Sequence, residues 1–380
     1  MKKIFIISGI LFGTTLLFWG VYNFAFKKET SITTKQTTPE QTKNAEKFMT
    51  TKKEQGKIYV ISDEAVIAPI FDKKKEKIIY YSKIDGTTWQ MDSDGKNKEQ
   101  LSAKELKGLE SIEWNMDKTK VISTFQNEGK RAFFLYDFVE NKATEIKKNA
   151  DLIAWDNSGA KIIYKYFDEK TKNRSLEIAD NNGSNFKTLV DKLPYRKISL
   201  KAVPQTSLIA YWNYPDINEE SKLQIVSALG GENKILFEKR FGADFLWSPD
   251  GEKTLVSSFA NNSDKKISLG IVDLTGKYTD LNFPTFAQKC VWSNDKKSIF
   301  CAIPGDIPND AILPNDYNSG KIKTKDTFWK IDVTTGIKER VLELSELKND
   351  YDADNLFLSS TEDALFFVNK IDGKLYRIDL

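Results

Sequence analysis

Short apolar runs alternate with polar turns along most of the chain, from residue 57 to residue 380. The runs are rich in Ile, Val, Tyr and Phe, and stretches of Asp, Asn, Gly and Lys separate them. This pattern is typical of many antiparallel β-strands joined by tight turns. It predicts an all-β fold for residues 57–380.

One turn occurs repeatedly in related forms. Its clearest copy is segment 247–256, in which a strand ends at Trp247, a Ser-Pro-Asp-Gly turn follows, and a second strand begins. Proline presets φ in such a turn, and Asp and Gly accommodate its remaining conformations. Trp247 has counterparts at Phe71, Trp114, Trp155, Val203, Trp292 and Leu358. The four tryptophans in this set are predicted to pack between neighbouring units.

The spacing of these positions predicts the architecture. Their successive steps are 43, 41, 48, 44, 45 and 66 residues. Further turns follow six of the positions after 12 to 14 residues and four of them after about 27 residues. Four strands in about 44 residues, repeated, are typical of a β-propeller, so we predict a seven-bladed β-propeller. The last unit ends after three strands. We predict that the unused strand at 57–62 completes it and closes the ring, which removes two exposed sheet edges.

These motifs resemble those of the TolB-like, WD-repeat-like β-propeller family. The resemblance rests on the Trp-Ser-Pro-Asp-Gly-x-Lys unit at 247–253, its diverged copies, and the Met-Asp-Ser-Asp-Gly-Lys-Asn segment at 91–97, and it covers residues 57–380. It implies the propeller architecture. The family includes binding proteins, secretion-linked periplasmic proteins and the propeller domains of serine peptidases. The peptidase activity is excluded here, because the chain has no histidine and no G-x-S-x-G motif.

Residues 1–26 are predicted to form an N-terminal transmembrane signal anchor. Residues 4–26 carry no charge, and lysines flank them on both sides. A helix of this length spans roughly 30 Å of hydrocarbon. A cleaved signal peptide is the alternative, although its apolar region would be shorter and would end in small residues. We expect the N-terminus to be cytoplasmic and the propeller to be extracytoplasmic. Residues 27–56 are almost entirely polar and are predicted to be a disordered tether.

Composition narrows the chemistry that this chain can perform. The 380 residues include no histidine and only two cysteines, which excludes Ser-His-Asp catalysis, His-ligated zinc and four-cysteine metal sites. We predict no metal site and no cofactor. The net charge of +3 divides into +5 for residues 1–56 and −2 for the remainder. A nearly neutral body argues against nucleic acid as a partner.

Cys290 and Cys301 flank the hairpin that follows Trp292. If Asp295 and Lys296 form the centre of the turn, the two cysteines are directly opposite each other, at a distance within reach of a disulfide. An extracytoplasmic body would permit oxidation. Two buried thiols that fill the core are the alternative.

The sixth step exceeds the others by about 22 residues. The excess is segment 303–326, which contains three prolines and replaces the turn between the second and third strands of its unit. The loop at 212–216 is expected on the same face of the propeller. Long loops with acidic and aromatic residues on a rigid scaffold often bind ligands, although surface elaboration without a function is the alternative. The predicted binding face comprises Trp212, Tyr214, Asp216, Asp306, Asp310, Asp316 and Tyr317.

These observations favour a membrane-anchored binding or protein-interaction module that holds an envelope protein, a peptide or a glycan. We expect a binding protein rather than an enzyme, because the sequence shows no catalytic constellation. The alternative is a carboxylate-based glycan hydrolase or lyase with its site in the channel mouth. Such an enzyme requires two carboxyl groups at about 5–9.5 Å, and Asp310 and Asp316 are the first candidates. A third reading is a scaffold that only assembles envelope complexes.

Overall fold

The fold is described from a computed structural model. It describes residues 57–127, 129–146 and 149–380, so the predicted anchor at 1–26 and the tether at 27–56 lie outside the described residues. Among those residues, no helix has the length and apolar character needed to cross a membrane.

The described chain consists mainly of β-strands. The first strands are β1 (Ile58–Asp72), β2 (Lys77–Ser82), β3 (Thr88–Met91), β4 (Glu99–Ser102), β5 (Leu109–Trp114), β6 (Lys120–Asn127), β7 (Lys130–Asp137), β8 (Lys142–Glu145), β9 (Ala150–Trp155), β10 (Lys161–Phe167), β11 (Arg174–Asp180), β12 (Lys187–Val190) and β13 (Ile198–Ala202). They are followed by β14 (Leu208–Asn213), β15 (Glu220–Ser227), β16 (Lys234–Trp247), β17 (Lys253–Phe259), β18 (Ser268–Asp273), β19 (Tyr278–Phe283), β20 (Cys290–Trp292), β21 (Ser298–Ile303), β22 (Thr327–Asp332), β23 (Lys338–Arg340), β24 (Ala353–Leu358), β25 (Ala364–Asn369) and β26 (Lys374–Asp379). The short helices are η1 (Ala287–Lys289), α3 (Asn315–Asn318) and η2 (Leu344–Glu346).

Consecutive strands pair in antiparallel fashion into five sheets. Three sheets contain four strands each (β5–β8, β9–β12 and β20–β23), and two contain seven strands (β24–β25–β26–β1–β2–β3–β4 and β13–β19). In each seven-stranded sheet, one long strand belongs to two successive strand groups. β16 pairs with β15 through its first half and with β17 from Phe241 onward. The predicted all-β fold of four-stranded units is confirmed.

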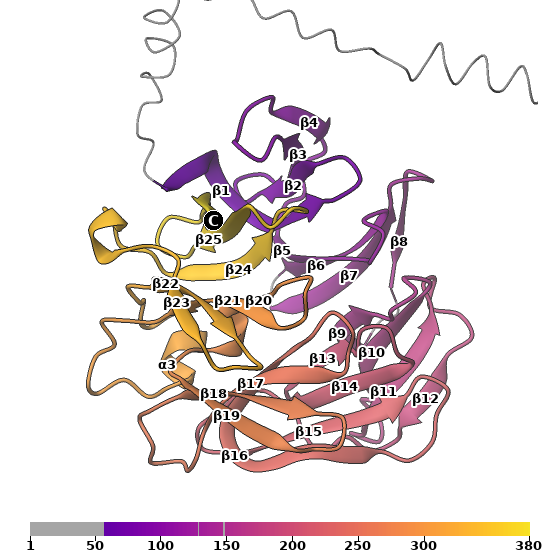
Figure 1. The fold of residues 1–380 in the computed structure, drawn as a ribbon. Coiled ribbons are helices and arrows are strands. Elements are labelled where there is room, and N and C mark those ends of the chain that lie inside the picture. Colours follow the sequence, from indigo (N-terminus) through magenta and orange to yellow (C-terminus); the bar gives the residue numbers. More distant parts are fainter. Residues whose placement is uncertain (1–56, 128, 147–148) are drawn as a thin grey trace, which may run out of the picture. The chain divides into compact units, whose positions relative to one another are not determined.

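The first described strand pairs with the last. Residues Ile58 to Val60 of β1 pair with Tyr376 to Ile378 of β26, whereas Val66 to Asp72 pair with β2. Figure 1 shows the indigo β1 beside the yellow strands of the C-terminal end. One strand therefore links the two ends of the described chain.

Three of the recurring tryptophans join their strand group to the preceding one by a hydrogen bond. The indole Nε1 of Trp114 donates a hydrogen bond to the Ala68 carbonyl at 3.1 Å. Trp155 donates to Glu113 at 3.0 Å, and Trp292 donates to Leu246 at 3.1 Å. Trp155, Trp247 and Trp292 are 5–7% exposed. Packing between units, as predicted for these tryptophans, is present in the structure.

Cys290 and Cys301 lie directly opposite each other in the β20–β21 pair. Their Cα atoms are 4.1 Å apart and their sulfur atoms form a disulfide bond. The bond ties the two strands together next to the connection that carries the long insertion.

Candidate ligand-binding face

Antiparallel pairing places two kinds of connection at the same end of every strand group. These are the connections from second to third strand and those between groups. We term this end the loop face, and it comprises residues 83–87, 103–108, 168–173, 191–197, 214–219, 260–267, 284–289, 304–326, 341–352 and 370–373. The predicted binding residues lie on it or at its border.

The insertion at 304–326, termed the bridge segment, extends from its own strand group to the β13–β16 group. Asn315 in α3 accepts a hydrogen bond from the backbone N–H of Ile217 at 3.0 Å and donates one to the Asp216 carboxylate at 2.8 Å. The bridge segment and the loop at 214–219 thus contact each other. A Cβ added at Gly242 would lie 2.7 Å from the Pro314 ring, so the backbone requires glycine for this close approach.

An apolar cluster supports the same end of the bridge segment. Leu313 and Tyr317 pack with Phe259, Phe286 and Ile217, and all five side chains are at least 93% buried. The rings of Tyr317 and Phe286 stack with a centroid distance of 4.7 Å. Burial of these side chains holds the segment against the sheet edges below it.

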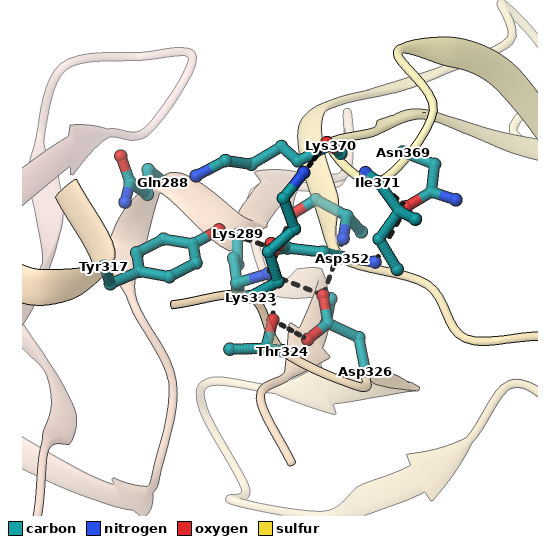
Figure 2. A network of polar contacts seen from close by, with 12 residues as sticks. Gln288, Lys289, Tyr317, Lys323, Thr324, Asp326, Asp352, Asn369, Lys370 and Ile371 are labelled. Atoms are coloured by element: carbon teal, nitrogen blue, oxygen red, sulfur yellow. Dashed lines mark hydrogen bonds and ion pairs between the residues drawn. The ribbon is translucent and has the colours of Figure 1, made fainter. Parts of the chain in front are cut away.

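A buried ionic network holds the other end. The Lys289 ammonium donates hydrogen bonds to Asp326 Oδ2 at 2.6 Å, to Asp352 Oδ1 at 2.8 Å and to the Ala353 carbonyl at 3.0 Å (Figure 2). The side chains of the lysine and both aspartates have no solvent exposure. Three donors meet three acceptors, so the buried ammonium is fully satisfied. Asp326 ends the bridge segment, and Asp352 belongs to the connection before β24.

The two carboxylates of this network differ in their environments. Burial would raise the pKa of Asp352, but the Lys289 ammonium and the Tyr317 hydroxyl outweigh burial and hold that pKa below its usual range. The Tyr317 hydroxyl donates to Asp352 Oδ1 at 2.9 Å. For Asp326, burial outweighs the attraction of Lys289, so its pKa is raised.

Several predicted binding residues have structural contacts instead of free side chains. Tyr317 is 1% exposed and Asp316 is 8% exposed. The Asp316 carboxylate accepts the Ile312 backbone N–H at 2.8 Å and pairs with Lys321 at 3.1 Å. These contacts hold the pKa of Asp316 below its usual range. Asp316 thus stabilises the turn that leads into α3.

Other predicted residues remain accessible on the loop face. Asp310 is exposed, and Asp306 is exposed and pairs with Lys325 at 3.0 Å. Tyr214 is 42% exposed, and the Lys197 ammonium lies 5.9 Å from the centroid of its ring.

Trp212 contacts the carboxylate of Asp244, a residue that the sequence pattern did not indicate as part of a site. Its Nε1 donates a hydrogen bond to Asp244 Oδ1 at 3.1 Å, and the indole itself is 2% exposed. Asp244 lies in the second half of β16, and desolvation by the surrounding protein raises its pKa. Lys201 of β13 opposes this shift electrostatically and itself pairs with Glu113 of β5 at 3.0 Å. This ion pair joins the first strands of two groups that are not consecutive in the sequence.

Lys289, Asp326, Asp352 and Asp244 were all missed from sequence. A Lys289–Asp352 contact joins residues 63 positions apart, and neither residue has a counterpart in the repeat. In the sequence, the only indication of a contact was that Asp326 and Lys289 each directly precede a strand, at the end of a loop on the same face.

Neither of the two best-formed cavities is lined by the bridge segment. The larger, of about 430 Å³, lies over the outer strands and is lined by residues that include Phe237, Arg240 and Tyr278. The smaller, of about 170 Å³, is lined by residues 82–86 and 105–109, together with Ile67.

No protein-family model matches the sequence, and no curated protein is detectably similar to it. Solved structures do match the fold. An oligogalacturonate lyase in complex with manganese superposes with a TM-score of 0.64 at 11% identity, over 85% of this chain and 93% of that one. The oligogalacturonate lyase from Vibrio parahaemolyticus superposes with a TM-score of 0.61 at 10% identity, over 86% of this chain and 94% of that one. The Swd1 β-propeller domain from Myceliophthora thermophila superposes with a TM-score of 0.53 at 12% identity, over 85% of this chain and 99% of that one.

The chain has the architecture of TolB-like and WD-repeat-like β-propellers, as the turn motifs predicted. Identities of 10–12% show a common fold and nothing about activity. The chain contains no histidine, and its described residues include no group of three or more His, Cys, Asp or Glu that could hold a metal ion.

Proposed function

We propose that this chain is a membrane-anchored, extracytoplasmic propeller of seven blades that binds a protein, peptide or glycan of the cell envelope through its loop face. Counting each seven-stranded sheet as two blades that share a long strand gives seven blades. The pairing of β1 with β26 supports closure of the ring. The uncharged segment 4–26 supports the anchor, and the disulfide supports an oxidising compartment.

The observation that carries this proposal is the fixed position of the bridge segment. Asn315, in the middle of the segment, is tied to Asp216, and Asp326, at its end, is tied to Lys289. A loop held in this way is a rigid platform, and binding to it costs little conformational entropy. Tyr214, Ile312 and Ile371, which are 42–53% exposed on this face, supply apolar contact area.

Retention of an envelope partner by the full-length chain tests the proposal. The detergent-solubilised chain is immobilised and exposed to envelope extract, beside a Tyr214→Ala/Ile312→Asp variant and a Leu229→Asp control. Leu229 is 79% exposed on a turn at the opposite end of the strands. We expect the same partner with the wild type and the control, and its loss with the double variant. Equal retention by all three proteins would contradict a site on the loop face.

Asp244 favours a second candidate function, glycan cleavage at the channel mouth. A raised pKa keeps a carboxyl group protonated closer to neutral pH, which is the form that a general acid requires. Trp212 orients this carboxyl group by its hydrogen bond. Release of reducing ends from a glycan panel by the wild type, and its loss in Asp244→Asn, would support this function. No turnover by the wild type would remove it.

A further inference from the structure

Lys289 brings a primary amine into direct contact with two carboxyl groups in a buried site. Its Nζ lies 2.6 Å from Asp326 Oδ2 and 2.8 Å from Asp352 Oδ1 (Figure 2). None of the three side chains is exposed to solvent. The Tyr317 ring lies 4.9 Å from the same nitrogen, measured to its centroid, and Phe286 stacks on that ring. An amine and a carboxyl group held in contact are the two reactants of amide formation.

The two carboxyl groups differ in the way that this reaction requires. Burial raises the pKa of Asp326, which favours the protonated carboxyl group that an amine can attack. Burial also acts on Asp352, but Lys289 and Tyr317 outweigh it and lower the pKa of that group. Asp352 is therefore the carboxylate that can take a proton from the ammonium. Neighbouring groups whose pKa values are pushed apart commonly divide acid and base roles in this manner.

Further contacts distinguish the two oxygen atoms of Asp326. Oδ2 accepts the backbone N–H of Ala353 at 2.7 Å, and this donor would stabilise the negative charge that develops on Oδ2 when an amine attacks. The Thr324 hydroxyl lies 2.7 Å from Asp326 Oδ1 and 3.0 Å from Asp352 Oδ1. This hydroxyl connects the two carboxyl groups, so it can pass a proton from Asp352 to Oδ1 of Asp326.

We propose that Lys289 and Asp326 condense to an intramolecular isopeptide bond, with Asp352 as the catalytic residue that transfers the protons. Asp352 takes a proton from the ammonium, and the free amine attacks Cγ of the protonated Asp326 carboxyl group. The N–Cγ bond forms. The Cγ–Oδ1 bond breaks as Thr324 passes the proton from Asp352 to Oδ1, which leaves as water. Asp352 then takes a second proton from the nitrogen. The products are an amide, one water molecule and a protonated Asp352, so atoms and charges balance without a further reactant.

The surroundings favour the amide over the separate groups. Condensation removes a buried ion pair, whose charges are costly to keep away from water. The reacting groups are already in contact, and well-oriented groups react as if present at about 10⁵–10⁸ M. Lys325 and Asp306 provide a contrast, because they pair at 3.0 Å but are 55% and 65% exposed. Water hydrates both of those charges, so we expect no bond between them.

The bond would join η1 to the end of the bridge segment. Lys289 directly precedes β20 and Asp326 directly precedes β22, so the covalent ring would enclose β20, β21 and the bridge segment. The Cys290–Cys301 disulfide lies inside that ring. Reducing agents do not open an amide, so the bridge segment would stay joined to its strand group when the disulfide is reduced. The bond requires no ligand on the loop face, so its test is independent of the proposed function.

Peptide mapping of the detergent-solubilised full-length chain detects the bond. The chain is reduced, alkylated, digested with trypsin and analysed by tandem mass spectrometry. Trypsin cannot cleave after a modified Lys289, so we expect a branched peptide that joins residues 278–296 to residues 326–330. Its mass should be lower than the sum of the two peptides by one water molecule. Lys325 and Asp306 are the internal control and should remain unjoined. Cleavage after Lys289 throughout the wild-type sample, or a bond at Lys325, would overturn the proposal.

Two variants test the roles of the residues, and the Cys290–Cys301 disulfide in an unreduced digest verifies that each has folded. Lys289→Arg keeps the positive charge and should give no branched peptide. Asp352→Asn keeps both reactants but removes the proton acceptor. The bonded fraction, followed after a pulse of expression, should then rise at least about a hundredfold more slowly, as expected for the loss of a general base. Asp352→Glu should restore part of the rate. A wild-type rate in folded Asp352→Asn, or a bond from Lys289 to Asp352, would contradict these roles.

Discussion

At the residue scale, the buried lysine determines how firmly the bridge segment is held. Lys289→Met would leave Asp326 and Asp352 buried without their cation. Removing one partner of a buried ion pair costs about 3–5 kcal/mol. Urea unfolding at pH 7 should show a loss of that size, whereas Lys83→Met, on an exposed side chain, should change the free energy of unfolding by less than about 0.5 kcal/mol. A loss below about 1 kcal/mol for Lys289→Met would contradict the role of the network.

Asp244 gives a pH-dependent prediction at the same scale. Its pKa is raised in the folded chain, so the folded state holds the proton more tightly than the unfolded state. The corresponding stability is present below the unfolded pKa of about 3.9 and is lost as pH rises through the folded pKa. Asp244→Asn removes this loss and can still accept the Trp212 hydrogen bond. The variant should therefore gain stability relative to the wild type between pH 4 and pH 7, and a constant difference would contradict the raised pKa.

Sequence predicted the location of the candidate face better than the roles of its residues. Tyr317 and Asp316 look like ligand-binding side chains in a proline-rich loop, but the fold uses them to hold that loop. Their partners are set by tertiary contacts over long sequence distances, such as Tyr317 with Asp352. No local pattern encodes those contacts, and the same reason hid Lys289 and Asp244.

At the element scale, the repeat of turns predicted the four-stranded groups because each turn has a local chemical signature. Gly251 has a φ of 71°, and a Cβ there would lie 2.1 Å from the Pro204 carbonyl oxygen of the preceding group. Gly336 has a φ of 74° and no atom within 4 Å of the corresponding position.

This pair of glycines permits a controlled comparison. Both Gly251→Ala and Gly336→Ala should lower the free energy of unfolding by about 1 kcal/mol, because alanine disfavours the left-handed backbone conformation. Only Gly251→Ala also forces two strand groups apart, so its melting temperature should fall clearly further than that of Gly336→Ala. Equal melting temperatures would show that the contact between groups at this turn is unimportant.

The two long strands were not predicted from sequence. Residues 57–62 were expected as a separate strand, but β1 continues through a register shift between Val60 and Ala65 and pairs on both sides. Polar residues at 62–64 interrupt the apolar pattern there, and they concealed the continuity of the strand.

Deletion of 57–62 tests the pairing of the first and last strands. The deletion would expose one edge of β26 and remove the buried side chain of Ile61. We expect a large drop in melting temperature, measured by circular dichroism of the purified full-length protein. A deletion of equal length in the polar segment 35–40 serves as the control and should have no effect on the melting of the propeller.

At the scale of the whole molecule, the proposed protein consists of a propeller with a loop face and of a membrane anchor that the sequence predicts. The fold could be predicted because repetition amplifies weak local signals across residues 57–380. The ligand could not be predicted, because recognition depends on which polar side chains remain without hydrogen-bond partners after folding. Lys289 looks like any other lysine in the sequence, and only the structure shows that it has three buried acceptors.

Site-specific photo-crosslinking in intact cells tests the central claim most directly. A photoreactive residue replaces Ile312 on the loop face or, as the control, Leu229 on the opposite turns. The account predicts a defined adduct with an envelope component from position 312 and none from position 229. An adduct from position 229 alone, or no adduct from position 312, would contradict a binding function for the loop face.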